Sequence, residues 1–148
     1  MTVSELKKLY EEDVYSWAMR NAELIRQGRF DEIDVDHVAE EIESVGKSER
    51  RELENRLIVL LSHLLKWQQQ PQRRGRSWTA TIREQRRRAR SVLMSNPGLQ
   101  PVLDSITDEA YASARLVASR ETDLDETVFA EVCPFALEAI LDDSFWPD

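Results

Sequence analysis

Cysteine, glycine, proline and histidine are all scarce in this 148-residue chain, which has one Cys, four Gly, five Pro and two His. The single cysteine, Cys133, excludes an intramolecular disulfide framework and supplies no Cys-x-x-Cys metal pair, so we expect it to be a small buried hydrophobic residue. The sequence contains no glycine-rich phosphate loop, no nucleophile elbow and no His-Glu-x-x-His motif. Few routes to conventional catalysis remain.

A long apolar segment is also missing. The longest apolar run, residues 57–67, is too short to span a bilayer and contains His63 and Lys66. The first residues combine acids with amphipathic spacing, in place of a basic region followed by an apolar core. We therefore expect a cytoplasmic protein without a signal peptide and without membrane contact.

The chain does have a helical hydrophobic pattern along nearly its whole length, and 41% of its residues are hydrophobic. Its size predicts a single domain over residues 1–148. No period-two run is long enough to predict a sheet, so the fold class is all-α, a bundle of about five to six helices with one long central helix or helix pair. Helices are expected over residues 4–27, 34–67, 77–95 and 99–117, with a short last helix from Pro134. Asp34 is the expected N-cap of the second, whose continuity through Gly46 stays open.

Several motifs, in order, resemble those of the DUF29 family of bacterial helical proteins. They are "YEEDVYSWA", "HVAEEIESVGKSERRELENRL", "HLLKW", "SWTATIREQR", "NPGL" and "CPFALEAILDDSFWP". The resemblance covers nearly the whole chain and implies an all-helical fold in the bacterial cytoplasm. It lends no catalytic residue, because the family is defined as one of unknown function. Proteins of the family that the chain resembles are often small members of the bacterial accessory gene pool, and this resemblance favours a partner-binding or regulatory role.

Cationic charge is concentrated in residues 63–90, which hold nine Lys or Arg and one acid, although the chain has a net charge of -8. At about 100° per residue, Arg83, Arg87 and Arg90 form a stripe facing away from Trp78 and Ile82. In one interpretation the stripe lies over the acidic segments and forms salt bridges. In the others it binds nucleic-acid phosphate, with Trp78 as a stacking group, or an acidic protein partner.

Ionisable residues also fall where the second helix needs apolar ones. In phase with Val38, the side chains of Glu41, Glu49, Glu52, Arg56 and His63 all project within about 60° of the core direction. Buried charges need partners, and Gln85 and Arg86 of the third helix could supply them. The pattern predicts an internal polar seam that either fixes helix packing or forms a binding site. The candidate binding residues are Glu41, Arg56, His63, Trp67, Trp78, Gln85 and Arg86.

An alternative is a metal-dependent enzyme in which Glu41, His63 and Glu84 bind a metal ion between helices. The Glu-x-x-His pairs typical of di-metal bundles are absent, so we expect no cofactor and no catalytic residue. Phe145 and Trp146 near the C-terminus either dock on the bundle or anchor a partner. The sequence thus favours a non-enzymatic binding or regulatory protein with a protein partner.

Overall fold

The computed structural model describes residues 1–148, and it confirms the all-α fold class. Six α-helices and four short 3-10 helices account for the secondary structure, and there is no strand. The α-helices are α1 (Val3–Glu12), α2 (Val14–Arg26), α3 (Val35–Gln69), α4 (Arg76–Ser95), α5 (Leu103–Thr122) and α6 (Leu137–Ile140). The 3-10 helices are η1 (Phe30–Glu32), η2 (Pro71–Arg73), η3 (Pro97–Val102) and η4 (Glu126–Val128). No helix is both long and apolar enough to cross a membrane.

The chain divides into two compact units, Met1–Ser48 and Glu49–Asp148, here called the N-terminal unit and the C-terminal unit. The helix α3 belongs to both, and it is continuous through Gly46, which answers the question that the sequence left open. Gly46 has room for a Cβ atom and ordinary helical geometry, so the glycine introduces no break. The assignment of all 148 residues to one domain stays a prediction.

The first expected helix, residues 4–27, is in fact two helices, because Asp13 ends α1 and begins α2. Asp13 has non-helical backbone angles (φ -155°, ψ 86°), its N–H donates to Leu9 O, and its carboxylate accepts from Ser16 N at 3.1 Å. A short acidic side chain caps a helix N-terminus better than it continues a helix. The apolar spacing is helical on both sides of the break and therefore did not reveal it.

The N-terminal unit is formed by α1, α2 and the start of α3, and its buried set is small. Three hydrophobic side chains, Leu6, Trp17 and Leu24, are buried together with Asn21 and Asp34. Asp34 precedes α3 directly, and its carboxylate accepts a hydrogen bond from His37 N. This contact confirms Asp34 as the N-cap of the second predicted helix.

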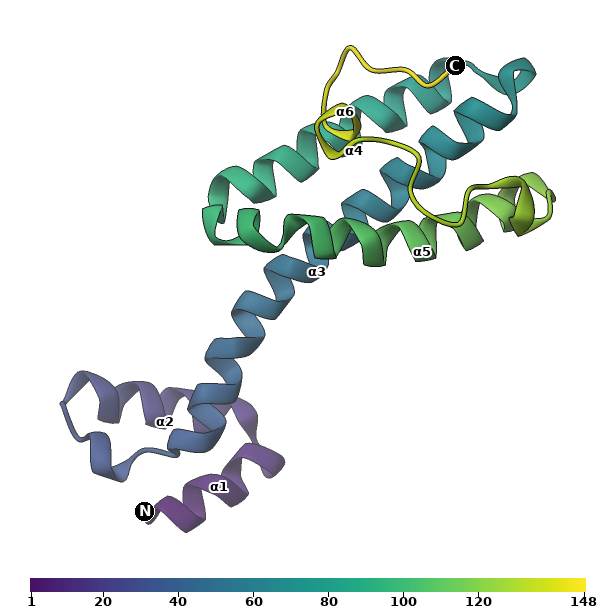
Figure 1. Ribbon diagram of the computed structural model, residues 1–148. Coiled ribbons are helices and arrows are strands. Elements are labelled where there is room, and N and C mark those ends of the chain that lie inside the picture. Colours follow the sequence, from purple (N-terminus) through teal and green to yellow (C-terminus); the bar gives the residue numbers. More distant parts are fainter. The chain divides into compact units, whose positions relative to one another are not determined.

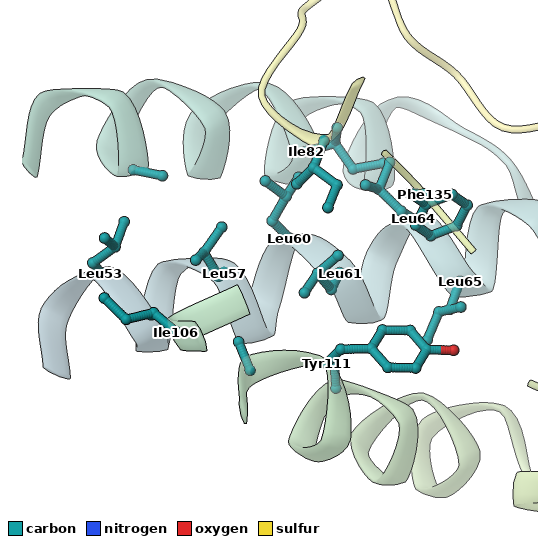
Figure 2. Packing of buried hydrophobic residues seen from close by; sticks show 14 of the residues in the cluster. Leu53, Leu57, Leu60, Leu61, Leu64, Leu65, Ile82, Ile106, Tyr111 and Phe135 are labelled. Carbon is teal, nitrogen blue, oxygen red and sulfur yellow. The ribbon is translucent and has the colours of Figure 1, made fainter. Parts of the chain in front are cut away.

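The C-terminal unit has the larger core, built on the second half of α3. Figure 2 shows Leu57, Leu60, Leu61 and Leu64 along this helix, with Ile82 of α4 on one side and Tyr111 of α5 on the other. Leucines recur at three- and four-residue spacing, so α3 presents apolar side chains to both neighbours. In Figure 1 the chain after α5 returns along these helices to the C-terminus.

The chain after α5 is mostly irregular but still contributes to the core. Phe129, Phe135 and Ile140 are buried, while only Leu137–Ile140 form an α-helix. The last predicted helix, from Pro134, is thus four residues long. Because so short a helix satisfies few of its own backbone groups, side chains of the other helices supply donors to the carbonyls of this segment.

Candidate functional site

Arg86 of α4 is the largest charged side chain that is fully shielded from solvent. Its Nε donates to Ile140 O and its Nη2 to Phe145 O, each at 2.8 Å. Its guanidinium also lies 5.5 Å from the ring centre of Trp146. Burial lowers the pKa of Arg86. No carboxylate contacts it, so carbonyl dipoles and an aromatic face solvate this buried cation.

Two further arginines hold the chain after α6, residues 141–148, which we call the tail. Arg74 donates to Trp67 O at 2.7 Å and to Pro147 O at 3.3 Å. Arg90 donates to Leu141 O at 2.7 Å and forms a salt bridge with Asp143. The concentration of arginine in residues 63–90 therefore has a structural role, because a segment with almost no regular structure needs external hydrogen-bond donors.

Aromatic side chains complete the attachment of the tail. The rings of Trp67 and Trp146 lie 4.7 Å apart, and the guanidinium of Arg74 lies 5.1 Å from the Trp67 ring centre. Phe145 contacts Phe135 edge to face, with ring centres 5.8 Å apart. Of the two alternatives for Phe145 and Trp146, docking on the bundle is the one that the structure shows, and Trp146 is part of the core surroundings.

Next to this region, a buried lysine that the sequence did not single out forms the tightest salt bridge between helices. Lys66 of α3 donates to Glu121 of α5 at 2.5 Å, and its Nζ lies 5.4 Å from the ring centre of Trp78. The hydrogen bond from Lys66 lowers the pKa of Glu121. His63 lies one turn earlier on α3, where its Nδ1 is 2.8 Å from Val59 O, and burial lowers its pKa.

The predicted polar seam is only partly present. Glu49 and Glu52 are exposed. The Nε atom of Arg56 is buried and lies 3.4 Å from a carboxylate oxygen of Glu52, but it has no hydrogen-bond partner. The Oε1 atom of Gln85 is likewise buried without a partner. From Leu53 onward the core direction of α3 is rotated by about 100° from that of Val38, so the assumption of a constant phase was wrong.

Glu41 lies in the N-terminal unit, in a different cluster of polar and aromatic side chains. The hydroxyl of Tyr10 donates to Glu41 at 2.5 Å, which raises the pKa of Tyr10 to about 12. The Tyr10 ring stacks on His37 with centres 4.0 Å apart. His37 Nδ1 is 2.6 Å from the buried carboxylate of Asp34, which also accepts from Trp17 Nε1 at 3.0 Å.

Asp34 is the polar centre of that cluster. Its own N–H donates to Asn21 Oδ1 at 2.9 Å, and its two carboxylate oxygens receive the contacts from Trp17 and His37. Burial acts to raise the pKa of Asp34, but the hydrogen bonds from His37 and Trp17 outweigh it and lower the pKa. Every polar group of this carboxylate has a partner, which is the arrangement expected of a structural network.

The arginine stripe is largely engaged within the protein. Arg87 and Arg88 both pair with Glu84 of their own helix, which lowers the pKa of Glu84 to about 2. Arg90 binds the tail, as described above. Arg83 is exposed and forms no salt bridge, so it is the one member of the predicted stripe without a partner in the chain.

The alternative metal ligands Glu41, His63 and Glu84 belong to three separate sets of contacts. The structure has no group of three or more His, Cys, Asp or Glu side chains arranged to hold a metal ion. Cys133 lies beside a pocket of about 270 Å³ that Asp108, Tyr111 and Glu131 also line. Burial raises the pKa of its thiol, opposite to the change that activates a cysteine nucleophile.

The clearest feature that sequence analysis missed is a set of exposed apolar side chains. Nine of the thirteen large hydrophobic residues that are exposed lie in the N-terminal unit, which has 48 of the 148 residues. The signal was available, because α2 is apolar around more than half of its circumference. These nine residues are Met1, Val14, Tyr15, Met19, Ile25, Phe30, Val35, Ile42 and Val45.

A comparison with protein-family models matches residues 9–146 to one described as "Domain of unknown function DUF29". This chain belongs to the DUF29 family. The match includes the N-terminal unit almost completely, so the exposed apolar side chains from Val14 to Val45 lie inside the DUF29 region. No curated protein and no solved structure matches the chain. Membership in DUF29 therefore defines the extent of the family region, and it assigns no activity.

Proposed function

We propose that this DUF29 protein acts through protein–protein interaction, without an enzymatic activity of its own, and that its N-terminal unit carries the binding surface. The observation that supports the proposal is the concentration of exposed large hydrophobic residues in Met1–Ser48. The same unit buries only three hydrophobic side chains of its own. Larger exposed apolar surfaces on soluble domains commonly mark sites that another molecule covers.

The contacts of the predicted site residues and of their charged neighbours support a structural role for these residues. Each ionisable group there with a marked change in pKa has a cause inside the fold. Lys66 lowers the pKa of Glu121, and burial lowers the pKa of His63. Arg87 and Arg88 lower the pKa of Glu84. Perturbed groups that are poised for chemistry usually face a cleft, whereas these face their own structural partners. The exposed apolar residues are thus the better candidate for function.

We also propose a bacterial cytoplasmic setting, which rests on the resemblance to DUF29 proteins described above. Fractionation of cells that express the chain from its own promoter is the test. Recovery in the cytosolic fraction is expected, and recovery with membranes or outside the cell would contradict the proposal.

The binding surface is tested by capture of the tagged, full-length chain from its own cells, followed by quantitative mass spectrometry. The variants Met19→Glu and Ile42→Glu place a charge on the N-terminal unit at side chains that are 52% and 68% exposed. The matched control is Met94→Glu in the C-terminal unit, where the side chain is 82% exposed. Exposed positions are chosen because a charge there leaves the core intact.

A polypeptide captured in stoichiometric amount by the native chain and by the control, but reduced about 10-fold or more by the N-terminal variants, is the expected result. The chain's own untagged copy counts among such polypeptides. Equal capture by all four proteins, or capture by none, would contradict the proposed surface. Circular dichroism of each variant checks that the helices remain formed.

A further inference from the structure

The helix α2 has an exposed apolar face beside its buried one. At about 100° per residue, the buried side chains Trp17, Asn21 and Leu24 lie within about 60° of one another. The next 140° or so of the helix surface is apolar except for Arg26, and it is mostly open to solvent. It contains Val14, Tyr15, Ala18, Met19, Ala22 and Ile25, which we call the α2 stripe. A helix that is apolar on two sides is normally covered on both.

Apart from Met19, which lies at one edge of the α2 stripe, the residues of the stripe are arranged by size along the helix. Tyr15 and Ile25 are the large side chains near its two ends, whereas Ala18 and Ala22 lie in the middle. In an antiparallel pair of identical helices, Tyr15 of one copy meets Ile25 of the other, and the alanines face one another at the centre. Small central residues let two helix axes approach to about 8 Å. The stripe is therefore complementary to itself.

The charges at the two ends of α2 fit the same arrangement. Arg26 lies within about 20° of Tyr15 on the helix surface and forms no salt bridge within the chain. The other end of α2 is preceded by three consecutive acids, Glu11, Glu12 and Asp13, of which the first two are unpaired. Antiparallel packing brings Arg26 of each copy to the acids of the other, whereas parallel packing brings like charges together.

The net negative charge of the N-terminal unit opposes association of two copies, so this repulsion has to be compared with the attractive contacts. Met1–Ser48 contains twelve acids and six Lys or Arg, so two copies approach with six negative charges each. At physiological ionic strength, screening limits this repulsion to about 8 Å. Apolar contacts and the close pairs at the helix ends act within that distance. A partner of a different sequence would need an apolar helix face with a positive charge at one end and negative charges at the other. A second copy of the chain already has this arrangement.

We propose that α2 is the contact helix of a two-fold symmetric homodimer, in which the α2 stripes of two copies pack antiparallel. This inference rests on the proposed function, because it names a second copy of the chain as the polypeptide that covers the N-terminal unit. Most soluble oligomers are homo-oligomers, and their commonest symmetry is two-fold. The interface is small, since one helix face falls below the roughly 800 Å² per partner of a standard interface. A dissociation constant on the order of 10 to 100 µM is expected.

The dimer is tested by sedimentation velocity of the untagged, full-length chain over concentrations from about 1 µM to about 1 mM. We expect the native chain to pass from monomer to dimer in this range. The variant Met19→Glu should weaken dimerisation about 10-fold or more, because it buries a charge in the stripe. Leu116→Glu is the matched control, since Leu116 is also helical and exposed, and it should dimerise like the native chain.

A charge exchange tests the antiparallel order without altering any apolar residue. Arg26→Glu and Glu12→Arg should each weaken the dimer several-fold, and the double variant should recover most of the loss, because the two positions meet across the interface. Absence of recovery in the double variant would overturn the antiparallel arrangement. This readout remains available if Met19→Glu fails to fold, since both charged residues are exposed.

The outcomes separate this inference from the proposed function. A monomer at every concentration, together with capture of a different polypeptide that the N-terminal variants abolish, would overturn the homodimer and leave the proposed function standing. A dimer that Met19→Glu and the charge exchange do not affect would overturn the assignment of α2. A monomer that captures no polypeptide would overturn both.

Discussion

Replacement of Arg86 by methionine is the most direct test of how the tail is held. Arg86→Met keeps the length and most of the apolar volume of the side chain but removes both donors, which leaves Ile140 O and Phe145 O without partners. Hydrogen bonds from a charged donor contribute about 1.5 to 3 kcal/mol each. Loss of two such bonds would cost about 3 to 6 kcal/mol.

Relief of burial offsets part of that cost. The native guanidinium is fully shielded from solvent without a carboxylate partner, and its Nη1 atom has no hydrogen bond. Methionine removes this desolvated charge. The expected net loss in the free energy of unfolding is therefore about 2 to 4 kcal/mol, and the midpoint of thermal unfolding should fall by about 4 to 16 °C. The exposed Arg88 provides the control, because Arg88→Met breaks only a surface pair with Glu84 and should cost less than about 1 kcal/mol.

Urea unfolding followed by far-ultraviolet circular dichroism measures the loss, and limited proteolysis shows where it occurs. Cleavage after Ile140 should accelerate in Arg86→Met and remain slow in Arg88→Met, because only the first variant loses the hydrogen bond to the tail at Phe145 and the one to Ile140 just before it. If Arg86→Met loses less than about 0.5 kcal/mol, or if its tail stays protected, the reasoning that Arg86 holds the tail is wrong.

Three further predictions concern buried ionisable groups. Burial lowers the pKa of His63, so the contribution of His63 to stability is complete above the unfolded-state pKa near 6.5 and falls as the pH drops below that value. The melting temperature of His63→Gln should therefore vary less between about pH 7 and pH 5 than that of the native chain. An identical pH dependence of the two proteins would contradict this prediction. Glu121→Gln should be more destabilising than Lys66→Met in urea, by about 1 kcal/mol or more. The first variant leaves a buried ammonium without a compensating negative charge, whereas the second leaves a carboxylate that reaches water, and the reverse order would refute the argument. Asp34→Ala should cost about 2 to 4 kcal/mol by removing the helix cap and the acceptor of the Trp17 indole, whereas Asp36→Ala, at an exposed neighbouring site, should cost less than about 1 kcal/mol in the same assay.

Local rules predicted much of this structure from the residues. Hydrophobic periodicity predicted an all-helical chain, the α4 helix to within one residue, and the cap at Asp34, because these features depend on neighbours three or four positions away. The same spacing correctly oriented Ile82 and Ala89 toward the core and Arg83 and Arg87 toward solvent. The break at Asp13 was missed, since the apolar pattern is helical on both sides of it.

Only the tertiary structure decided which groups meet across the chain. Arg86 and Arg90 bind carbonyl groups of α6 and the tail more than fifty residues away, and every residue has a carbonyl, so no pattern in the sequence indicates which one receives the donor. The pairing of Lys66 with Glu121 depends on how α3 and α5 pack, and the rotation of the core direction along α3 depends on which neighbours each part of the helix has. The sequence by itself determined the helices and their polar and apolar faces through short-range spacing. Packing decided which of those faces are covered, and it left the apolar face of α2 exposed.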